Sequence, residues 1–148
     1  MGRPPLHDDA RLKQDMVNCL WQLGFDAPIS AVVESTGAKA ASLYARFGSK
    51  KGMLLAALDA YAEEHLADLQ RLLHGMPPGQ ARIRAVLEKA IECFDDPLHR
   101  GCFLVNGVLE ANAGEPEFAE RLRKHMGDIR TELSWALAET PGLSRVFS

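Results

Sequence analysis

The sequence has little of what marks a secreted, disulfide-bonded, membrane-spanning or zinc-binding protein. It has three widely spaced cysteines among 148 residues, Cys19, Cys93 and Cys102. An odd and scattered set argues against a disulfide framework or a zinc site and fits a reducing compartment. No apolar run approaches the roughly 20 residues that span a bilayer, and residues 1–5 are not followed by an apolar signal core. We therefore expect a cytoplasmic protein that does not associate with membranes.

The sequence also lacks the signatures of catalytic and cofactor-binding sites. Its five histidines show no metal-ligand spacing with acids or cysteines. Gly-x-Ser-x-Gly, phosphate-loop and dinucleotide-binding motifs do not occur. The acidic run from Glu88 to Asp96 fits a solvated helix face better than a catalytic pair. We therefore expect no enzymatic activity, no metal and no cofactor.

Positive charge is scarce and unevenly placed. The formal net charge is −3, yet residues 1–51 hold seven Lys or Arg against five Asp or Glu, a net charge of +2. Residues 52–148 hold ten against fifteen, a net charge of −5. Such an asymmetry is a weak indication that the N-terminal part faces nucleic acid.

Helical periodicity is what the sequence does have, nearly throughout. Apolar residues recur at steps of three and four, and glycines and prolines separate the periodic segments. We expect seven helices, over about 9–23, 28–36, 39–47, 50–73, 83–94, 102–112 and 116–139. The sixth is apolar nearly all round, which is typical of a helix buried on several sides.

Three short helices followed by a long fourth helix are typical of a helix-turn-helix DNA-binding domain. The third helix would enter the major groove with its N-terminal residues toward base edges. Its exposed positions precede a basic set suited to phosphate contacts, Arg46, Lys50 and Lys51. From the pattern alone, a plain helical bundle stays an equally good interpretation.

Residues 37–50, Gly-Ala-Lys-Ala-Ala-Ser-Leu-Tyr-Ala-Arg-Phe-Gly-Ser-Lys, closely resemble the DNA-binding signature of TetR/AcrR-type bacterial transcriptional regulators. Residues 20–27 match that family's first helix and its exit, residues 2–4 match its opening, and residues 100–106 resemble a segment of one branch. The resemblance implies an all-α protein. Residues 1–52 would form a three-helix helix-turn-helix domain, joined by a long helix to a shortened ligand-binding and dimerisation domain in residues 53–148.

The resemblance also implies which residues contact DNA. Bases would be read by the start of the third helix, Lys39, Ala40, Ala41 and Ser42, and phosphates would be held by Tyr44 and Lys50, with Arg46 in place of a frequent histidine. Alanine can contact a thymine methyl but makes no bidentate hydrogen bond, so Lys39, Ser42 or DNA shape would carry the sequence preference. Arg3 could enter the minor groove, the alternative being a terminus without fixed structure.

Candidate effector-binding residues are polar or aromatic side chains on the apolar helices of the C-terminal half: His65, Phe94, Cys102, Phe103, Asn106, Glu110 and Met126. Phe94, Phe103 and Met126 are expected rather as plain core, and His65 and Asn106 rather as hydrogen-bonded polar groups near an edge. Asn106 and Glu110 lie four residues apart and would share one helix face. Cys102 follows His99 and Arg100 near a helix N-terminus, a setting that favours a reactive thiolate and a redox or electrophile sensor. The alternative is a small buried apolar residue.

The predicted function is transcriptional regulation by sequence-specific binding to a double-stranded DNA operator. The regulator would be a homodimer and a repressor, released by an unidentified small-molecule effector. A second hypothesis is a helical small-molecule-binding or protein-interaction module that does not bind DNA productively. Members of the resembled family are usually longer and pair through two further C-terminal helices. This chain would thus either dimerise through its sixth and seventh helices or leave apolar surface without its usual cover.

Overall fold

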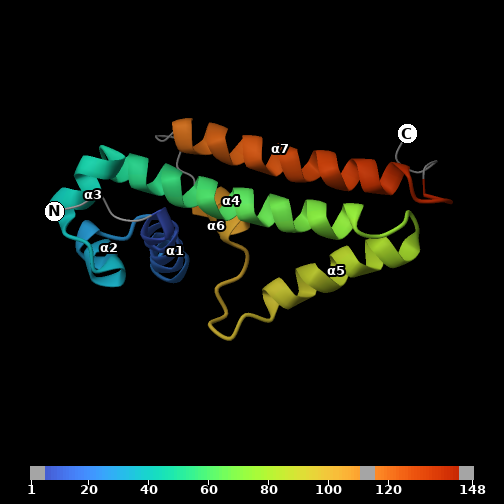
Figure 1. The fold of residues 1–148 in the computed structure, drawn as a ribbon, viewed down its shortest axis with the longest axis horizontal. Helices are drawn as coiled ribbons and strands as arrows, with labels where there is room; N and C mark the ends of the chain where they lie inside the picture. Colours follow the sequence, from blue (N-terminus) through green and yellow to red (C-terminus); the bar gives the residue numbers. More distant parts are fainter. Residues whose placement is uncertain (1–5, 111–115, 144–148) are drawn as a thin grey trace.

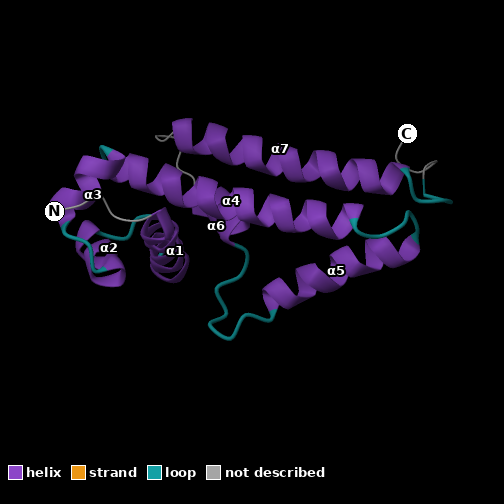
Figure 2. Cartoon of the chain, viewed as in Figure 1, coloured by secondary structure: helices purple, strands orange, loops and turns teal. Residues whose placement is uncertain are grey.

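The computed structural model describes residues 6–110 and 116–143, and within these ranges the chain forms seven helices and no strand (Figure 2). They are α1 (Leu6–Leu23), α2 (Ile29–Thr36), α3 (Ala40–Phe47), α4 (Lys50–His74), α5 (Gln80–Phe94), α6 (Phe103–Glu110) and α7 (Pro116–Ala138). Each expected helix is present, and most bounds lie within three residues of those predicted. The all-α fold class is confirmed.

The long helix α4 is the axis of the molecule (Figure 1). The three short helices α1, α2 and α3 gather at its N-terminal end, and α7 runs alongside it in the same direction. Helix α5 returns beneath α4 in the opposite direction, and α6 lies behind α4. The chain therefore places the helix-turn-helix at one end of α4 and the helical half along the rest of it.

Local signals account for where the N-terminal helices begin. Pro28 stands in an extended conformation immediately before α2, where a missing backbone N–H costs nothing. Ser49 caps α4, because its hydroxyl accepts a hydrogen bond from the backbone N–H of Gly52 at 3.0 Å. These two residues fix where α2 and α4 begin.

An aromatic cluster joins the two halves of the molecule. Phe103 of α6 is fully buried at its centre, and its ring centroid lies 4.8 Å from that of Tyr61 and 4.9 Å from that of Phe25. Trp21 packs edge-on against both Tyr61 and Phe103, and Phe25 against Phe118. The prediction that Phe103 belongs to the core is confirmed.

The expectation that α6 is buried on several sides is wrong. Phe103, Leu104 and Gly107 are buried against the rest of the protein, whereas Val108 and Leu109 of the opposite face are 50% and 79% exposed. Helix α5 likewise exposes a row of large apolar side chains, Leu87, Ile91 and Phe94, which Leu98 continues beyond the helix. No described helix covers these faces.

Phe94 and Met126 are therefore not core residues, contrary to expectation. Phe94 is 67% exposed and Met126 is 37% exposed. Phe94 belongs to the exposed apolar row of α5, and Met126 lines a groove between α6 and α7. Separately, no helix in the described ranges is both long and apolar enough to cross a membrane.

Candidate nucleic-acid interface and its link to the helical half

The turn between α2 and α3 is fixed by one glycine and one hydroxyl. Gly37 adopts a left-handed conformation, with φ 71°, and its backbone N–H donates to the carbonyl oxygen of Val33 at 2.9 Å. The Thr36 hydroxyl donates to the Val32 carbonyl oxygen at 2.7 Å and accepts from the Ala38 N–H at 3.2 Å. Sequence reasoning missed Thr36, although a threonine before a turn glycine is a known turn signal. Together these contacts set the angle between the two helices.

Helix α3 has one buried anchor and one exposed face. Leu43 is only 1% exposed and holds the helix against the core. The opposite face carries the predicted base-contacting and phosphate-contacting positions, with Ala41, Ser42 and Tyr44 exposed and Ala40 half-buried. Lys39 is exposed at the N-cap position and forms no ion pair with any described residue. Five of the predicted DNA contacts thus lie together at one end of the molecule.

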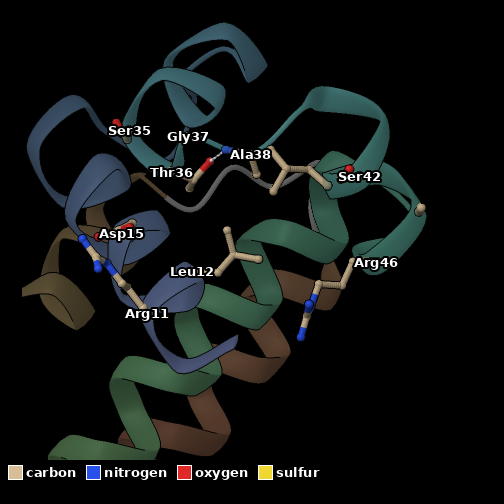
Figure 3. A pocket seen from close by; sticks show the side chains of 11 residues that line it. Arg11, Leu12, Asp15, Ser35, Thr36, Gly37, Ala38, Ser42 and Arg46 are labelled. Atoms are coloured by element: carbon tan, nitrogen blue, oxygen red, sulfur yellow. Dashed lines mark hydrogen bonds between the residues drawn. The ribbon is translucent and has the colours of Figure 1, made fainter. Parts of the chain in front are cut away.

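An open hollow of about 800 Å³ lies beside this face (Figure 3). Helix α1 forms one wall with Arg11 and Asp15, the α2–α3 turn forms a second, and Ser42 and Arg46 of α3 form the third. The hollow is bordered by two cations and one acid. A negatively charged backbone passing α3 would meet the Arg11 guanidinium at its edge, and would meet that of Arg46 only in competition with Asp9.

The basic residues after Tyr44 are engaged in contacts within the protein. Arg46 forms an ion pair with Asp9 of α1. The ammonium group of Lys50 donates to the backbone carbonyl of Asp26 at 3.4 Å, and that of Lys51 lies 2.7 Å from the carboxylate of Glu117 on α7. These contacts hold α3 and the start of α4 against their neighbours. Arg3, the remaining predicted DNA contact, lies outside the described residues.

Trp21 at the end of α1 is the main link between the helix-turn-helix and the helical half. Its indole N–H donates to the carbonyl oxygens of Arg100 and Gly101, at 3.3 and 3.2 Å, and the Arg100 guanidinium lies 4.1 Å from its ring centroid. Asp96 accepts from both the side chain and the backbone N–H of Arg100, and these bonds lower the pKa of Asp96 to about 2. The loop between α5 and α6 is thereby held against α1.

Asn106 and Glu110 of α6 complete this link. The Asn106 side-chain amide donates to the Arg100 carbonyl oxygen at 2.7 Å. The Glu110 carboxylate accepts from the backbone N–H of Phe25 at 2.8 Å, where the chain leaves α1. The two residues do share one side of α6, as expected, but neither lines the hollow beside α3, the cavity between α4, α5 and α7 or the groove between α6 and α7. Their contacts tie α6 to the helix-turn-helix instead.

A cavity of about 200 Å³ lies between α4, α5 and α7. Among the seven candidate effector residues only His65 lines it, beside Cys93, which sequence reasoning did not single out. Burial lowers the pKa of His65. Its ring stacks on that of Tyr61, with centroids 5.8 Å apart, and burial together with the nearby Cys102 and Cys93 raises the pKa of Tyr61.

The other candidate effector residues are dispersed. Met126 lines a different groove, of about 540 Å³, between α6 and α7. Phe94 is exposed, Phe103 is fully enclosed by other aromatic rings, and Cys102 is half-buried immediately before α6. Of the seven predicted effector residues, the cavity between α4, α5 and α7 is lined by His65 alone, and the assignment of an effector to any of them stays a prediction.

Comparison with known proteins identifies relatives of both halves. Residues 17–57 match the family model described as bacterial regulatory proteins, tetR family, and residues 79–141 match the one described as tetracyclin repressor-like, C-terminal domain. The chain is 34% identical over 137 residues to the HTH-type transcriptional repressor ComR of Escherichia coli (strain K12), covering 88% of this chain and 64% of ComR.

A second relative is the uncharacterized HTH-type transcriptional regulator YezE of Bacillus subtilis (strain 168). It is 24% identical over 133 residues, covering 86% of this chain and 69% of YezE. The chain thus spans about two thirds of the length of these relatives. No solved structure shows a significant match.

Proposed function

The chain belongs to the TetR family of bacterial regulatory proteins, and from this premise we propose that it binds operator DNA and represses transcription. Residues 1–52 would form the DNA-binding domain and residues 53–148 the regulatory domain. One observation carries the proposal. Helix α3 is anchored by Leu43 and presents Lys39, Ser42 and Tyr44 to solvent at the end of the molecule.

The chemistry of that face suits the two kinds of contact that a DNA reader makes. Lys39 and Ser42 offer donors to base edges, and Ala41 offers a methyl group to thymine. Tyr44 and Lys50 would contact phosphates on the groove wall. Lys50 would reach a phosphate by exchanging its long contact with the Asp26 carbonyl. Arg46 would contact a phosphate only by breaking its ion pair with Asp9, so we assign Arg46 a smaller contribution to DNA binding than Lys50.

Repression and its release by an effector rest on two further observations. ComR, which covers most of this chain, is itself named a repressor. The 200 Å³ cavity touches His65, and His65 stacks on Tyr61 of the aromatic cluster that packs against Trp21. An effector in this cavity would press on the same residues that join the helical half to α1.

A single α3 helix reads few base pairs, so we propose that two copies act together as a homodimer. Two-fold related heads about one DNA turn apart would bind a near-palindromic operator. The exposed apolar faces of α5 and α6 supply surface for such pairing. Because a bacterial regulator acts where the DNA is, this protein would work in the cytoplasm.

The second candidate function is a small-molecule-binding or interaction module without productive DNA binding. It is favoured by the same exposed apolar side chains. Binding of upstream DNA fragments across a salt series, with light scattering in parallel, separates the two functions. A steep loss of specific affinity with salt supports the regulator. A monomer with weak, sequence-independent binding supports the module.

Single substitutions at the phosphate-contacting positions test the assignment of α3. Lys50→Ala should weaken DNA binding equally for specific and non-specific fragments and reduce the salt slope by about 0.9, the share of one neutralised phosphate. Tyr44→Ala should weaken it by roughly tenfold or less, the value of one hydrogen bond, and leave the salt slope unchanged. The measurement is fluorescence anisotropy at four salt concentrations.

Lys124→Ala serves as the matched control, because Lys124 is an exposed lysine on α7, paired with Asp128 at 3.0 Å and remote from α3. Its DNA affinity should equal that of the parent protein. Circular dichroism confirms that all three variants are folded. If both Lys50→Ala and Tyr44→Ala bind DNA as the parent does, α3 is not the DNA-contacting helix.

A further inference from the structure

We propose that the cavity between α4, α5 and α7 binds an uncharged molecule built on a single aromatic ring, with one small polar substituent directed at His65. This names the ligand class of the regulatory half and rests on the proposed function for its effect on DNA binding. Three properties of the cavity carry it: its volume, the chemistry of its walls, and the position of its polar groups.

The volume limits the ligand to about one ring. The cavity measures about 200 Å³. An apolar cavity of about 150 Å³ in a protein interior accommodates benzene. The remaining space corresponds to a few more non-hydrogen atoms, enough for a methyl and a hydroxyl or an aldehyde group. Larger ligands such as steroids or fused multi-ring compounds would exceed this volume and extend past the exposed Lys89 and Ala90 into solvent.

The walls are apolar and come from three helices. The apolar lining residues are Leu69 and Leu72 of α4, Val86 and Ala90 of α5, and Ile129 and Leu133 of α7. Apolar walls with a few fixed polar groups are typical of small-molecule sites. A rigid ring fills such a space without freezing internal rotations, which lowers the entropic cost of binding. The Cys93 sulfur offers the ring a further favourable contact.

The polar groups lie together and are uncharged or already paired. His65 and Cys93 face the cavity, and because burial lowers the pKa of His65, its imidazole is neutral near pH 7. A neutral imidazole offers one donor and one acceptor, which matches a phenol hydroxyl or an aldehyde oxygen. The two charged lining residues form ion pairs: Asp68 with Arg71, and Lys89 with Glu92. A carboxylate ligand would therefore find no uncompensated cation and would lose its hydration.

The position of the cavity connects this ligand to the DNA-binding end. The His65 ring stacks on Tyr61, and Tyr61 lies 5.3 Å from Trp21 and 4.8 Å from Phe103 between ring centroids. Trp21 in turn holds the α5–α6 loop through the carbonyl oxygens of Arg100 and Gly101. A ligand that shifts His65 would move the aromatic cluster between α4, α6 and α1.

Calorimetry and thermal shift on the full chain test the ligand class with four probes: 4-methylphenol, toluene, benzoate and 2-naphthol. We expect 4-methylphenol to bind with one site per chain, toluene to bind more weakly, and benzoate and 2-naphthol to bind at least about tenfold more weakly than 4-methylphenol, a difference of about 1.4 kcal/mol. If benzoate binds as well as 4-methylphenol, or if no neutral one-ring probe binds, the proposal is overturned.

Three variants locate the site. Val86→Trp fills the cavity and should lower the affinity for 4-methylphenol at least about tenfold. Leu87→Trp, on the exposed side of the same helix, should leave the affinity for 4-methylphenol unchanged. His65→Leu should remove the preference for 4-methylphenol over toluene while toluene still binds. If Val86→Trp is folded by circular dichroism and binds the probe like the parent, the ligand lies elsewhere.

Operator binding by the ligand-free chain is measured in parallel, so that the two proposals can fail separately. DNA binding without any probe binding overturns the ligand class and leaves the regulator intact. Probe binding without DNA binding overturns the regulator and leaves the cavity assignment intact. Binding of both, with 4-methylphenol lowering DNA affinity in the parent but not in Val86→Trp, supports both.

Discussion

At the scale of single residues, Arg82 is a buried polar side chain whose burial and contacts the sequence pattern does not predict. It is only 1% exposed, and its guanidinium donates to the carbonyl oxygen of Leu73, at 3.4 Å, and to that of Ala136, at 3.1 Å. It also lies 4.8 Å from the ring centroid of Trp135. Sequence reasoning places an arginine on a solvated face by default. The acceptor on α7 is 54 residues away, a contact that periodicity does not encode.

We expect Arg82→Ala to lower the free energy of unfolding by about 2–4 kcal/mol, because charge-assisted hydrogen bonds at two helix ends are lost together with buried contacts. Arg84→Ala, two residues along the same helix at an exposed position, should change it by about 0.5 kcal/mol or less. Urea unfolding followed by circular dichroism measures both. Equal effects of the two substitutions would contradict a clamping role for Arg82.

The lowered pKa of Asp96 leads to a prediction of how the stability of the fold depends on pH. Because hydrogen bonds from Arg100 lower its pKa from 3.8 to about 2, the folded state binds its proton more weakly than the unfolded state does. Its contribution is therefore complete above about pH 4 and is lost as the pH falls through about 2. We expect the parent to be more stable than Asp96→Asn at pH 5, with the difference shrinking toward pH 2. A constant difference across unfolding curves at pH 5, 4, 3 and 2 would contradict this.

The candidate site residues also divide into those whose exposure follows from the local sequence and those whose position depends on contacts between distant helices. Lys39, Ser42 and Tyr44 are predictable as an exposed group, because a short helix with one buried leucine leaves its other faces free. The effector candidates are not, because cavity lining depends on how three distant helices meet. His65 lines the cavity, whereas Asn106 and Glu110 are used to hold α6 against α1.

At the scale of elements, helix bounds follow from local chemistry and are predictable, whereas helix coverage is not. Pro28, Gly37 and Ser49 each mark an end by their own backbone or side-chain properties. The apolar character of α6 suggested burial on several sides, yet Leu109 is 79% exposed. The residue composition of a helix gives the amount of its apolar surface. How much of that surface is buried depends on which other segments pack against the helix.

The turn before α3 gives a prediction at this scale. Gly37 has a φ of 71°, where a side chain is strained although space is open around it. Gly37→Ala should cost about 1 kcal/mol of stability and weaken DNA binding by tilting α3. Gly127→Ala is the control, because Gly127 lies within α7 with open space around it, and alanine there should stabilise the protein by up to about 1 kcal/mol.

Thermal unfolding and anisotropy on the same preparations measure both effects. A Gly37→Ala variant that is destabilised but binds DNA normally would show that the turn supports the fold without setting the position of α3. A Gly127→Ala variant with altered DNA affinity would show that changes in α7 reach the DNA-binding end directly.

At the scale of the whole molecule, the helix-turn-helix and the helical half share one aromatic cluster and one loop. The helix-turn-helix contributes Trp21 and Phe25, and the helical half contributes Tyr61, Phe103 and the loop around Arg100. Because these contacts join residues about 80 positions apart in sequence, no local pattern predicts them. The sequence predicts an N-terminal helix-turn-helix and a helical half that follows it, but the contacts between the two are visible only in three dimensions.

The exposed apolar faces predict self-association of the whole chain. Leu109 on α6 and Leu23 at the end of α1 are both exposed leucines, 79% and 56%, and Leu109 shares its helix with two further exposed apolar residues, Val105 and Val108. We expect the parent to dimerise in a concentration-dependent manner by sedimentation velocity. Leu109→Lys should shift the equilibrium toward monomer, because a charge cannot be buried without a partner, and Leu23→Lys should not.

DNA binding provides the second readout of this prediction. Two linked heads bind a two-site operator more tightly than one head does, because the second contact becomes intramolecular. Leu109→Lys should therefore lose affinity for a palindromic fragment and keep the parent's affinity for a half-site fragment. If Leu109→Lys and Leu23→Lys sediment alike and bind the palindrome alike, the copies pair through a surface other than the exposed face of α6.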